Sequence, residues 1–425
     1  MKSFKVIILA TAGVLALLIL PIRPGVARTS VSAGNPSQFA GEAAKSDYIV
    51  IAWNDLGMHC ISPGFSQMAI LPPYNNLQAQ VIRRGSPPRI VTSGVTLRYS
   101  IKKNTTVVGK TDFWQYAQPL FGVDLPVGIG LTGNGLSGLM VRVGNHYEAR
   151  GIPTVPRDDQ GRWYPYQKGV VRVFDASGTL LTRTVATIPV SDELRCDRCH
   201  DADGVGSPGF DTGTVDGNIL AVHDARHDTA LTESQPVLCA SCHADNALGT
   251  PGRPGVPSLS LAMHGRHSRL GSDVPSCYDC HPGSQTQCLR TKLEGMGPNG
   301  TEPNCERCHG SIANVAATIR DGRQPWLDEP TCAQCHGASY ATNQPLYRNS
   351  TGHHGVQCAA CHNSPHAWYP SNLAVDNKQT LRLQGSAGPI GEHDNCVVCH
   401  TSEPDDDEGG IHDGDDDDDD DDRQS

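Results

Sequence analysis

The chain has 425 residues, of which 38% are hydrophobic and only 5% aromatic, and its formal net charge at pH 7 is −11. This apolar content is low for a chain that would build its core from side chains alone, so we expect other apolar groups to fill part of the interior. Residues 403–425 contain fourteen acidic residues and one arginine, which leaves a net charge of +2 on the rest. Nothing in this balance favours nucleic acid as a partner. The acidic end is predicted to be a disordered tail, because its like charges repel and it has little to bury.

The first residues have the pattern of an export signal. Two lysines precede an apolar run of fifteen residues at 6–20, and two prolines and three small residues follow it. Such a run is short for a membrane span and typical of a signal peptide core. We expect residues 1–27 to be a signal peptide, with an uncleaved anchor as the alternative. Residues 28–46 are then a flexible lead-in, and the protein is exported to the periplasm, the outer surface or the medium.

Residues 47–190 have the pattern of strands and turns. The stretch 48–53 is a short apolar run with β-branched residues, and 95–101 alternates with period two. Two further runs, at 170–174 and 179–188, flank an Asp-Ala-Ser-Gly turn. These patterns predict a β-rich domain without a long amphipathic helix.

The second half of the chain repeats Cys-x-x-Cys-His seven times, where chance gives roughly 0.03 such motifs at this Cys and His content. The motif cysteines are Cys196, Cys199, Cys239, Cys242, Cys277, Cys280, Cys305, Cys308, Cys332, Cys335, Cys358, Cys361, Cys396 and Cys399, and the motif histidines are His200, His243, His281, His309, His336, His362 and His400. Two thiols at this spacing can form thioethers to the vinyl groups of one haem, and the histidine can bind its iron. Structural zinc and redox Cys-x-x-Cys sites do not require a histidine after every second cysteine. The motifs therefore predict seven covalent haem c groups.

Little protein surrounds each of these haems. The motifs span 205 residues, about 29 per haem, and the gaps between them range from 21 to 38 residues. We expect a loop-rich, mostly irregular domain with short helices at 191–402, organised around stacked haems. The predicted fold class is thus an N-terminal β-rich domain followed by this multihaem domain.

Eight further histidines lie between the motifs, against seven irons. We predict that they supply the second axial ligands: His223, His227, His264, His267, His353, His354, His366 and His393. Spacings of three and four residues place both rings of a pair on one helix face, whereas adjacent histidines can serve two haems. His146 and His412 are predicted to be bystanders.

The haem on Cys305 and Cys308 has no histidine in either flanking gap. Its second ligand must come from a distant part of the sequence: one of the eight histidines, His59 or a neighbouring subunit. We favour a ligand within the same chain. Met296 is closer in sequence but lies in a Gly-Pro-Asn loop, where a methionine is more often incidental. His59 is otherwise interpreted as a packed loop histidine.

Two cysteines, Cys60 and Cys288, lie outside the motifs. We predict that neither forms a thioether to haem. In an oxidising compartment they could form a disulfide that joins the two halves of the chain, but sequence alone does not decide whether the two residues are close enough.

The seven motifs and the segment 353–370, His-His-Gly-Val-Gln-Cys-Ala-Ala-Cys-His-Asn-Ser-Pro-His-Ala-Trp-Tyr-Pro, resemble the multihaem c-type cytochromes of metal-reducing bacteria. That family includes outer-surface and extracellular cytochromes, some of which polymerise into nanowires. The resemblance covers residues 196–402 and implies that His353, His354 and His366 ligate other haems in a closely stacked chain. It implies other redox proteins or cytochromes as partners, extracellular metal oxides as acceptors and a homo-polymer as one assembly.

Two axial histidines leave no open position on an iron, which suits outer-sphere electron transfer at low potential. We therefore predict an exported electron-transport protein that carries electrons along bis-His haems to extracellular acceptors such as Fe(III) minerals. The alternative is a multihaem oxidoreductase with one open haem that acts on nitrogen or sulfur oxyanions. Such enzymes often carry a departure at the active haem, such as a lysine in place of the motif histidine. All seven motifs here end in histidine, so electron transfer is favoured over catalysis.

Overall fold

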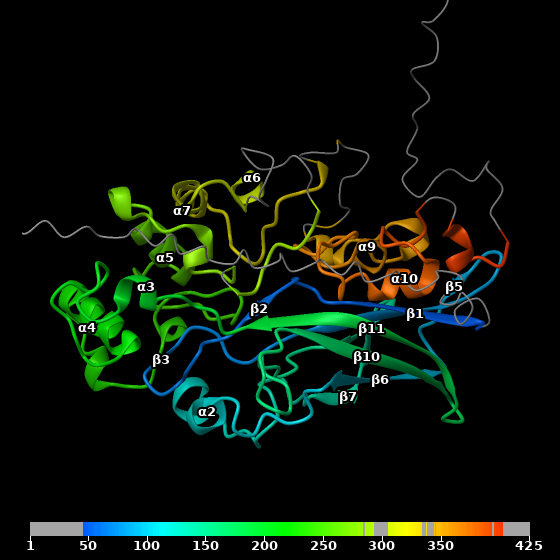
Figure 1. The fold of residues 1–425 in the computed structure, drawn as a ribbon, viewed down its shortest axis with the longest axis horizontal. Coiled ribbons are helices and arrows are strands. Elements are labelled where there is room, and N and C mark those ends of the chain that lie inside the picture. Colours follow the sequence, from blue (N-terminus) through cyan, green and yellow to red (C-terminus); the bar gives the residue numbers. More distant parts are fainter. Residues whose placement is uncertain are drawn as a thin grey trace, which may run out of the picture. The chain divides into compact units, whose positions relative to one another are not determined.

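The computed structural model describes residues 46–283, 285–292, 305–333, 337, 344, 346–392 and 395–402. The expected signal peptide, nearly all of the lead-in and the acidic tail lie outside these residues, as do Met296, Cys335, His336, His393 and His412. The described residues fall within one compact unit. They confirm the predicted fold class: a β-rich region comes first, and short helices joined by loops follow it (Figure 1).

Two five-stranded sheets form the β-rich region. One has the strand order β1-β4-β9-β8 with β5 paired to β4, the other has the order β2-β11-β10-β6-β7, and β12 and β3 form a two-stranded sheet. The strands are β1 (Tyr48–Trp53), β2 (His59–Cys60), β3 (Met68–Ala69), β4 (Leu77–Arg83), β5 (Arg89–Ile90), β6 (Val95–Lys102), β7 (Ser137–Leu139), β8 (Val141–Val143), β9 (His146–Ala149), β10 (Tyr166–Asp175), β11 (Leu180–Ser191) and β12 (Val237–Leu238). Leu77 and Val81 of one sheet and Leu97 and Val171 of the other belong to one apolar cluster, so the two large sheets share a core.

The strands expected at 48–53 and 95–101 are confirmed as β1 and β6. The predicted hairpin is also confirmed, because β10 pairs with β11 and the Gly178 amide donates to the Asp175 carbonyl. Gly178 has a φ of +86°, which few residues other than glycine adopt at low cost. The region also contains the nine-residue helix α2 (Phe113–Phe121), with Pro119 inside it.

Apart from strand β12, the regular elements described in the second half are short helices and single 3₁₀ turns. The α-helices are α3 (Asp197–His200), α4 (Val215–His227), α5 (Leu259–His267), α6 (Cys305–His309), α7 (Ile312–Arg320), α9 (Cys358–His362) and α10 (Lys378–Gln384). The 3₁₀ turns are η1 (Leu231–Glu233), η2 (Cys239–Ser241), η3 (Gly271–Asp273), η4 (Cys277–Asp279), η6 (Tyr347–Asn349), η7 (His353–Gly355) and η8 (Asn395–Val398). Thr214, Ser258 and Ser311 cap α4, α5 and α7, each through a side-chain oxygen that accepts from an amide of the first turn. None of the described helices is long and apolar enough to cross a membrane.

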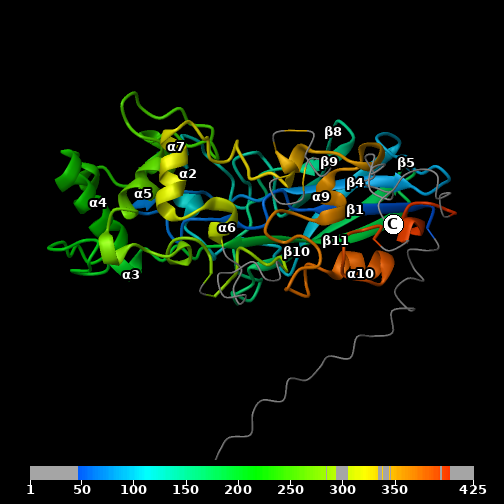
Figure 2. The ribbon, with the colours of Figure 1, turned by 90° about the horizontal axis from the view of Figure 1, so that it is seen from above.

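Strand β1 belongs to both halves of the fold. Its alternate residues Val50 and Ala52 point into the core between the sheets. Ile49, Ile51 and Trp53 point the other way and pack with Tyr347, Ala360 and Ile390 of the second half. The views in Figures 1 and 2 both place α9 and α10 against this side of the β-rich region. The sheet thus serves as a platform for the C-terminal motifs.

Helix α10 also forms hydrogen bonds with the unpaired edge of β1. The Gln379 side-chain amide donates to the Ala52 carbonyl, and its oxygen accepts from the Ala52 amide, both at 2.9 Å. The same oxygen accepts from the Thr184 hydroxyl of β11 at 2.7 Å. A glutamine thereby takes the place of a neighbouring strand at an otherwise open edge.

Candidate haem sites

Each Cys-x-x-Cys-His motif that is fully described forms a single helical turn, in α3, α6 or α9 or in the 3₁₀ turns η2, η4 and η8. In the motif at 196–200, the His200 amide donates to the Cys196 carbonyl at 2.8 Å, and the motif at 277–281 closes in the same way. Residues three apart lie on one face of such a turn, so both thiols can reach one flat ligand while the following histidine approaches it. Of the fifth motif, Cys332 is described.

Five motif histidines each face a second histidine that lies outside the motifs. Their ring centres are 6.1–6.4 Å apart in the pairs His200–His267, His243–His223, His281–His264, His309–His366 and His400–His353. Two imidazoles that bind opposite sides of one metal, each at about 2 Å, have ring centres about 6 Å apart. The five pairs therefore have the spacing of bis-histidine iron sites, and each lies beside a pair of motif cysteines.

Helix α5 contributes to two of these pairs. Its His264 faces His281 of the third motif, and its His267 faces His200 of the first. Three-residue spacing does bring the rings near each other, but they have different partners. In α4, by contrast, His223 faces His243 while His227 lies beside His223, with ring centres 4.8 Å apart.

The same geometry gives the central motif histidine a candidate partner. His309 faces His366, which follows the sixth motif in sequence and belongs to the same chain. His366 and His354 are both in the left-handed backbone region, with φ of +64° and +50°. Such conformations cost energy in residues other than glycine and cluster at functional sites. His354 lies beside His353, with ring centres 4.9 Å apart.

Hydrogen bonds orient most of these rings. A backbone carbonyl accepts from Nδ1 of His243, His264 and His267, at 2.7–2.8 Å. Because a carbonyl can only accept, the proton is on Nδ1 and Nε2 keeps a free lone pair for a metal. Hydroxyl groups of Ser207 and Thr229 take the same position at Nδ1 of His200 and His223, at 2.7 and 3.0 Å.

Several of the paired rings have lowered pKa values. Burial, together with the charge of the facing histidine, lowers the pKa of His200, His281 and His309 to about 4. Burial also lowers the pKa of His264 and His366. A neutral imidazole is the form that binds iron, and the lowered pKa values of these five rings favour that form.

Neighbouring thiols show which motifs lie side by side. A neighbouring thiol is the main cause of the raised pKa of Cys277. For Cys280, Cys358 and Cys399 burial is the main cause of the raised pKa, and a neighbouring thiol is the second. Cys277 forms a side-chain hydrogen bond with Cys305, and the pairs Cys199–Cys280, Cys332–Cys358 and Cys361–Cys399 are near enough to influence each other electrostatically. The third motif therefore lies near both the first and the fourth, and the sixth lies near both the fifth and the seventh. His366 joins these groups, because it follows the sixth motif and faces the fourth.

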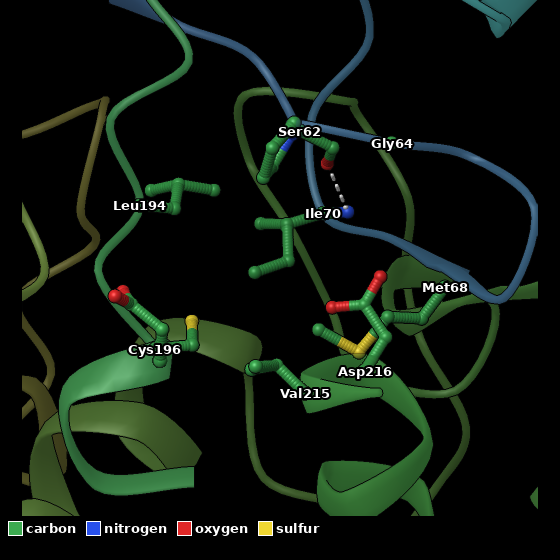
Figure 3. Close-up of a pocket in the computed structure, with 10 residues that line it drawn as sticks. Ser62, Gly64, Met68, Ile70, Leu194, Cys196, Val215 and Asp216 are labelled. Atoms are coloured by element: carbon green, nitrogen blue, oxygen red, sulfur yellow. Dashed lines mark hydrogen bonds between the residues drawn. The ribbon is translucent and has the colours of Figure 1, made fainter. Parts of the chain in front are cut away.

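An apolar cavity of about 250 Å³ opens beside the first motif. Met68, Ile70, Leu194 and Val215 line it together with Cys196 (Figure 3). Asp216 also faces this cavity, and burial raises the pKa of its carboxyl group. Apolar walls next to a motif cysteine suit an apolar macrocycle, so the residues present fit haem c.

The described residues include His59, Cys60 and Cys288, which lie outside the motifs and have predictions of their own. His59 is buried and pairs with Asp55 at 3.0 Å, as the packed-histidine interpretation expects. Cys60 and Cys288 are free thiols, so the structure contains no disulfide between them. Burial raises the pKa of both, that of Cys288 to about 11, and the nearby Cys288 contributes to the shift of Cys60.

His146 forms part of a polar cluster in the β-rich region. Its Nε2 lies 2.8 Å from the carboxylate of Glu148. Burial alone would raise the pKa of Glu148, but hydrogen bonds from His146, Arg150 and Gln78 outweigh it and bring the pKa to about 2.

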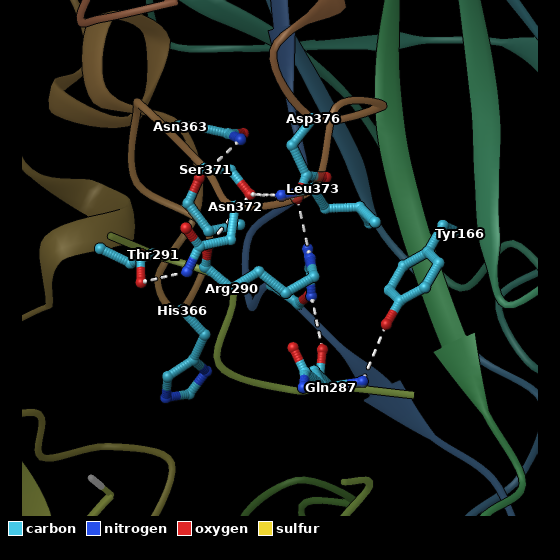
Figure 4. Close-up of polar contacts among 12 residues, drawn as sticks. Tyr166, Gln287, Arg290, Thr291, Asn363, His366, Ser371, Asn372, Leu373 and Asp376 are labelled. Carbon is cyan, nitrogen blue, oxygen red and sulfur yellow. Dashed lines mark hydrogen bonds and ion pairs between the residues drawn. The ribbon is translucent and has the colours of Figure 1, made fainter. Parts of the chain in front are cut away.

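The contacts of Arg290 could not be predicted from any sequence motif. Arg290, two positions after Cys288, forms a buried ion pair with Asp376 at 2.8 Å. Its backbone amide donates to the His366 carbonyl at 2.5 Å, and its guanidinium donates to the Gly57 carbonyl at 2.8 Å. Figure 4 shows the Arg290 side chain between Gln287 and Asp376. These contacts hold the segment that carries a candidate ligand, yet no motif marks them.

Residues 324–401, which contain the last three motifs, match the family of cytochrome c7 and related cytochrome c. The match supports a multihaem c-type cytochrome. Cytochromes of this kind bind haem covalently, transfer electrons to and from redox partners and are typically exported. No curated protein and no solved structure matches the chain.

Proposed function

We propose that this multihaem cytochrome is an exported electron conduit with seven haems c, each held by two histidines. The observation that carries the proposal is the set of five motif histidines that face a second imidazole at 6.1–6.4 Å. A bound haem supplies a one-electron iron couple. With both axial positions filled by protein, no position is left for a substrate, which favours outer-sphere transfer.

The remaining ligands follow the same pattern. For the fifth and sixth motifs, whose histidines are His336 and His362, we propose His354 and His393 as the second ligands. His227 is then the histidine in excess. The nearness of thiols from the first, third and fourth motifs, and of those from the fifth, sixth and seventh, supports closely spaced haems, because short separations favour electron transfer from one haem to the next.

We propose other cytochromes or redox proteins as electron donors and extracellular acceptors, such as Fe(III) minerals, as the destination. The negative tail at 403–425, predicted to be disordered, adds a surface that attracts cations and basic partners. A ligand for His309 from the same chain removes one reason to expect a homo-polymer, so assembly would need another contact.

The test combines intact mass and electron paramagnetic resonance on the secreted protein. We expect the mass of the cleaved chain plus seven haems, and low-spin ferric signals throughout. A stable haem-free or zinc-loaded protein would refute the haem assignment. A dominant high-spin signal in the native protein would instead favour the oxidoreductase with an open haem.

A further inference from the structure

The outward face of the sheet formed by β6, β10 and β11 is strongly cationic. Residues along these strands alternate between the core and the outside. The outward positions hold no acidic residue but five basic ones, which we call the cationic face: Arg98, Lys102, Lys168, Arg172 and Arg183. Among the described residues, no carboxylate forms an ion pair with any of these five side chains. The charge of this face is therefore not balanced by its own surroundings.

Cross-strand pairing brings these charges together in two rows. Arg172 of β10 lies directly opposite Arg98 of β6 and Arg183 of β11. Lys168 of β10 lies directly opposite Lys102 of β6. The Cβ atoms of residues in such positions are about 5 Å apart, and like charges there are destabilising. An anion that lies over the face would relieve this repulsion.

Helix α10 adds a further positive charge at the edge of the cationic face. The side chain of Lys378, at the start of this helix, lies beside that of Lys168. This contact, together with burial, lowers the pKa of Lys168 to about 8, and the charges of Lys102 and Lys103 add to the effect. Two ammonium groups side by side favour a shared anion between them.

The acidic end of the chain begins close to the cationic face. The hydroxyl group of Ser402, the last described residue, donates to the hydroxyl group of Ser86 at 3.1 Å. Ser86 follows strand β4, which pairs with β1. Ser46, just before β1, donates to the Leu181 carbonyl at 3.3 Å, two positions before Arg183. The residues that follow Ser402 therefore start near one end of the cationic face.

The charge and length of this acidic tail, residues 403–425, match the face. The tail contains fourteen acidic residues and one arginine. An extended chain spans at most about 3.5 Å per residue, whereas three neighbouring strands are only about 10 Å across. The tail is thus long enough to cross the face from its starting point.

We propose that the acidic tail binds the cationic face of its own chain and masks it. A strongly anionic partner then has to displace the tail before it reaches the face, and a basic partner has to draw the tail away from it. The contact is electrostatic, so salt weakens it. This inference goes beyond the electron conduit and does not depend on the haem ligands.

The test uses the full holo-protein and a fluorescent peptide of eight aspartates as the probe, with binding followed by fluorescence anisotropy at low salt. In the tail variant, each residue from Asp415 to Asp422 is replaced by Asn, which keeps the chain length. A tethered segment acts at an effective concentration on the order of 1 mM, so the native tail should compete with the probe. We expect the tail variant to bind the probe about tenfold more tightly than the parent protein, and this binding should weaken as salt is added.

Two further pairs of substitutions, each made in the tail variant, locate the binding site. Arg98→Gln with Arg183→Gln removes two exposed charges from the cationic face. The matched control, Arg142→Gln with Arg253→Gln, removes two exposed charges outside it. We expect the first pair to abolish most of the probe binding and the control pair to leave it unchanged.

Carbodiimide cross-linking of the parent protein, followed by mass spectrometry, gives a measurement that does not require a variant to fold. We expect tail carboxylates to be joined to Lys102, Lys168 or Lys378 within one chain. Cross-links to Lys110 or Lys292 in place of these would overturn the inference, as would cross-links between two chains. Equal probe binding by the parent and the tail variant would also overturn it. So would probe binding that survives the loss of both arginines from the face.

Discussion

The buried ion pair between Arg290 and Asp376 leads to the strongest prediction about stability. The two side chains are 2% and 0% exposed, and the guanidinium Nε lies 2.8 Å from Oδ2 of Asp376. Ser371 donates to the same oxygen at 2.8 Å, while Oδ1 of Asp376 is buried without a hydrogen bond. The carboxylate therefore depends on the arginine for compensation of its charge.

Replacing Arg290 by Met keeps much of the side-chain volume but leaves Asp376 as an isolated buried charge. Removing one member of a buried pair costs about 3–5 kcal/mol, and we expect the upper part of this range because the Gly57 carbonyl also loses its donor. Urea unfolding of the holo-protein, followed by circular dichroism and by the low-spin haem spectrum, measures this loss. Loss of order at His366 should appear as one high-spin haem at urea concentrations below the main transition.

Two further variants make the result interpretable. The double variant Arg290→Met with Asp376→Asn removes both charges and should recover part of the lost free energy. The matched control, Arg195→Met, breaks the exposed pair with Asp197, whose side chains are 34% and 50% exposed, and should cost about 1 kcal/mol or less. An Arg290→Met protein as stable as the control variant would refute the reasoning.

Three other predictions concern single positions. Gly57→Ala should disturb the haem on the fourth motif, because an added Cβ would lie 1.8 Å from the Pro365 carbonyl oxygen and Gly57 has a φ of +89°. Electron paramagnetic resonance should then show one high-spin haem. Glu148→Gln should lower stability at pH 7 by up to about 3 kcal/mol, since the folded pKa of about 2 lies below the ordinary 4.5. That difference should fade as pH falls from about 4.5 to 2, where the native carboxylate gains its proton, and urea midpoints across this range test it. His223→Ala should convert one haem to high spin, whereas His227→Ala should change no haem signal.

Each of these has an outcome that would contradict it. A fully low-spin Gly57→Ala protein would show that the loop at 54–60 does not hold the distal ligand. A stability difference for Glu148→Gln that persists at pH 2 would point to packing and not to charge. A high-spin haem in His227→Ala, with none in His223→Ala, would exchange the roles of the two histidines.

The sequence alone determined the parts of this protein that depend on local chemistry. Cys-x-x-Cys-His needs only one turn of chain to present its ligands, so the candidate attachment points could be predicted from the sequence. The strands at 48–53 and 95–101 and the hairpin around Gly178 were also predictable, because alternation and turn residues act over a few neighbours.

Only the tertiary structure decided which histidine faces which motif. His366 reaches His309 across 57 positions of sequence, and His264 and His267 divide between two motifs although both belong to α5. Such pairings depend on how short segments pack against each other, which no local pattern encodes. The same holds for Arg290, whose stabilising partners Asp376 and Gly57 are close to it in space but remote in sequence. Because these groups are buried, the ion pair with Asp376 and the hydrogen bond to the Gly57 carbonyl are strong.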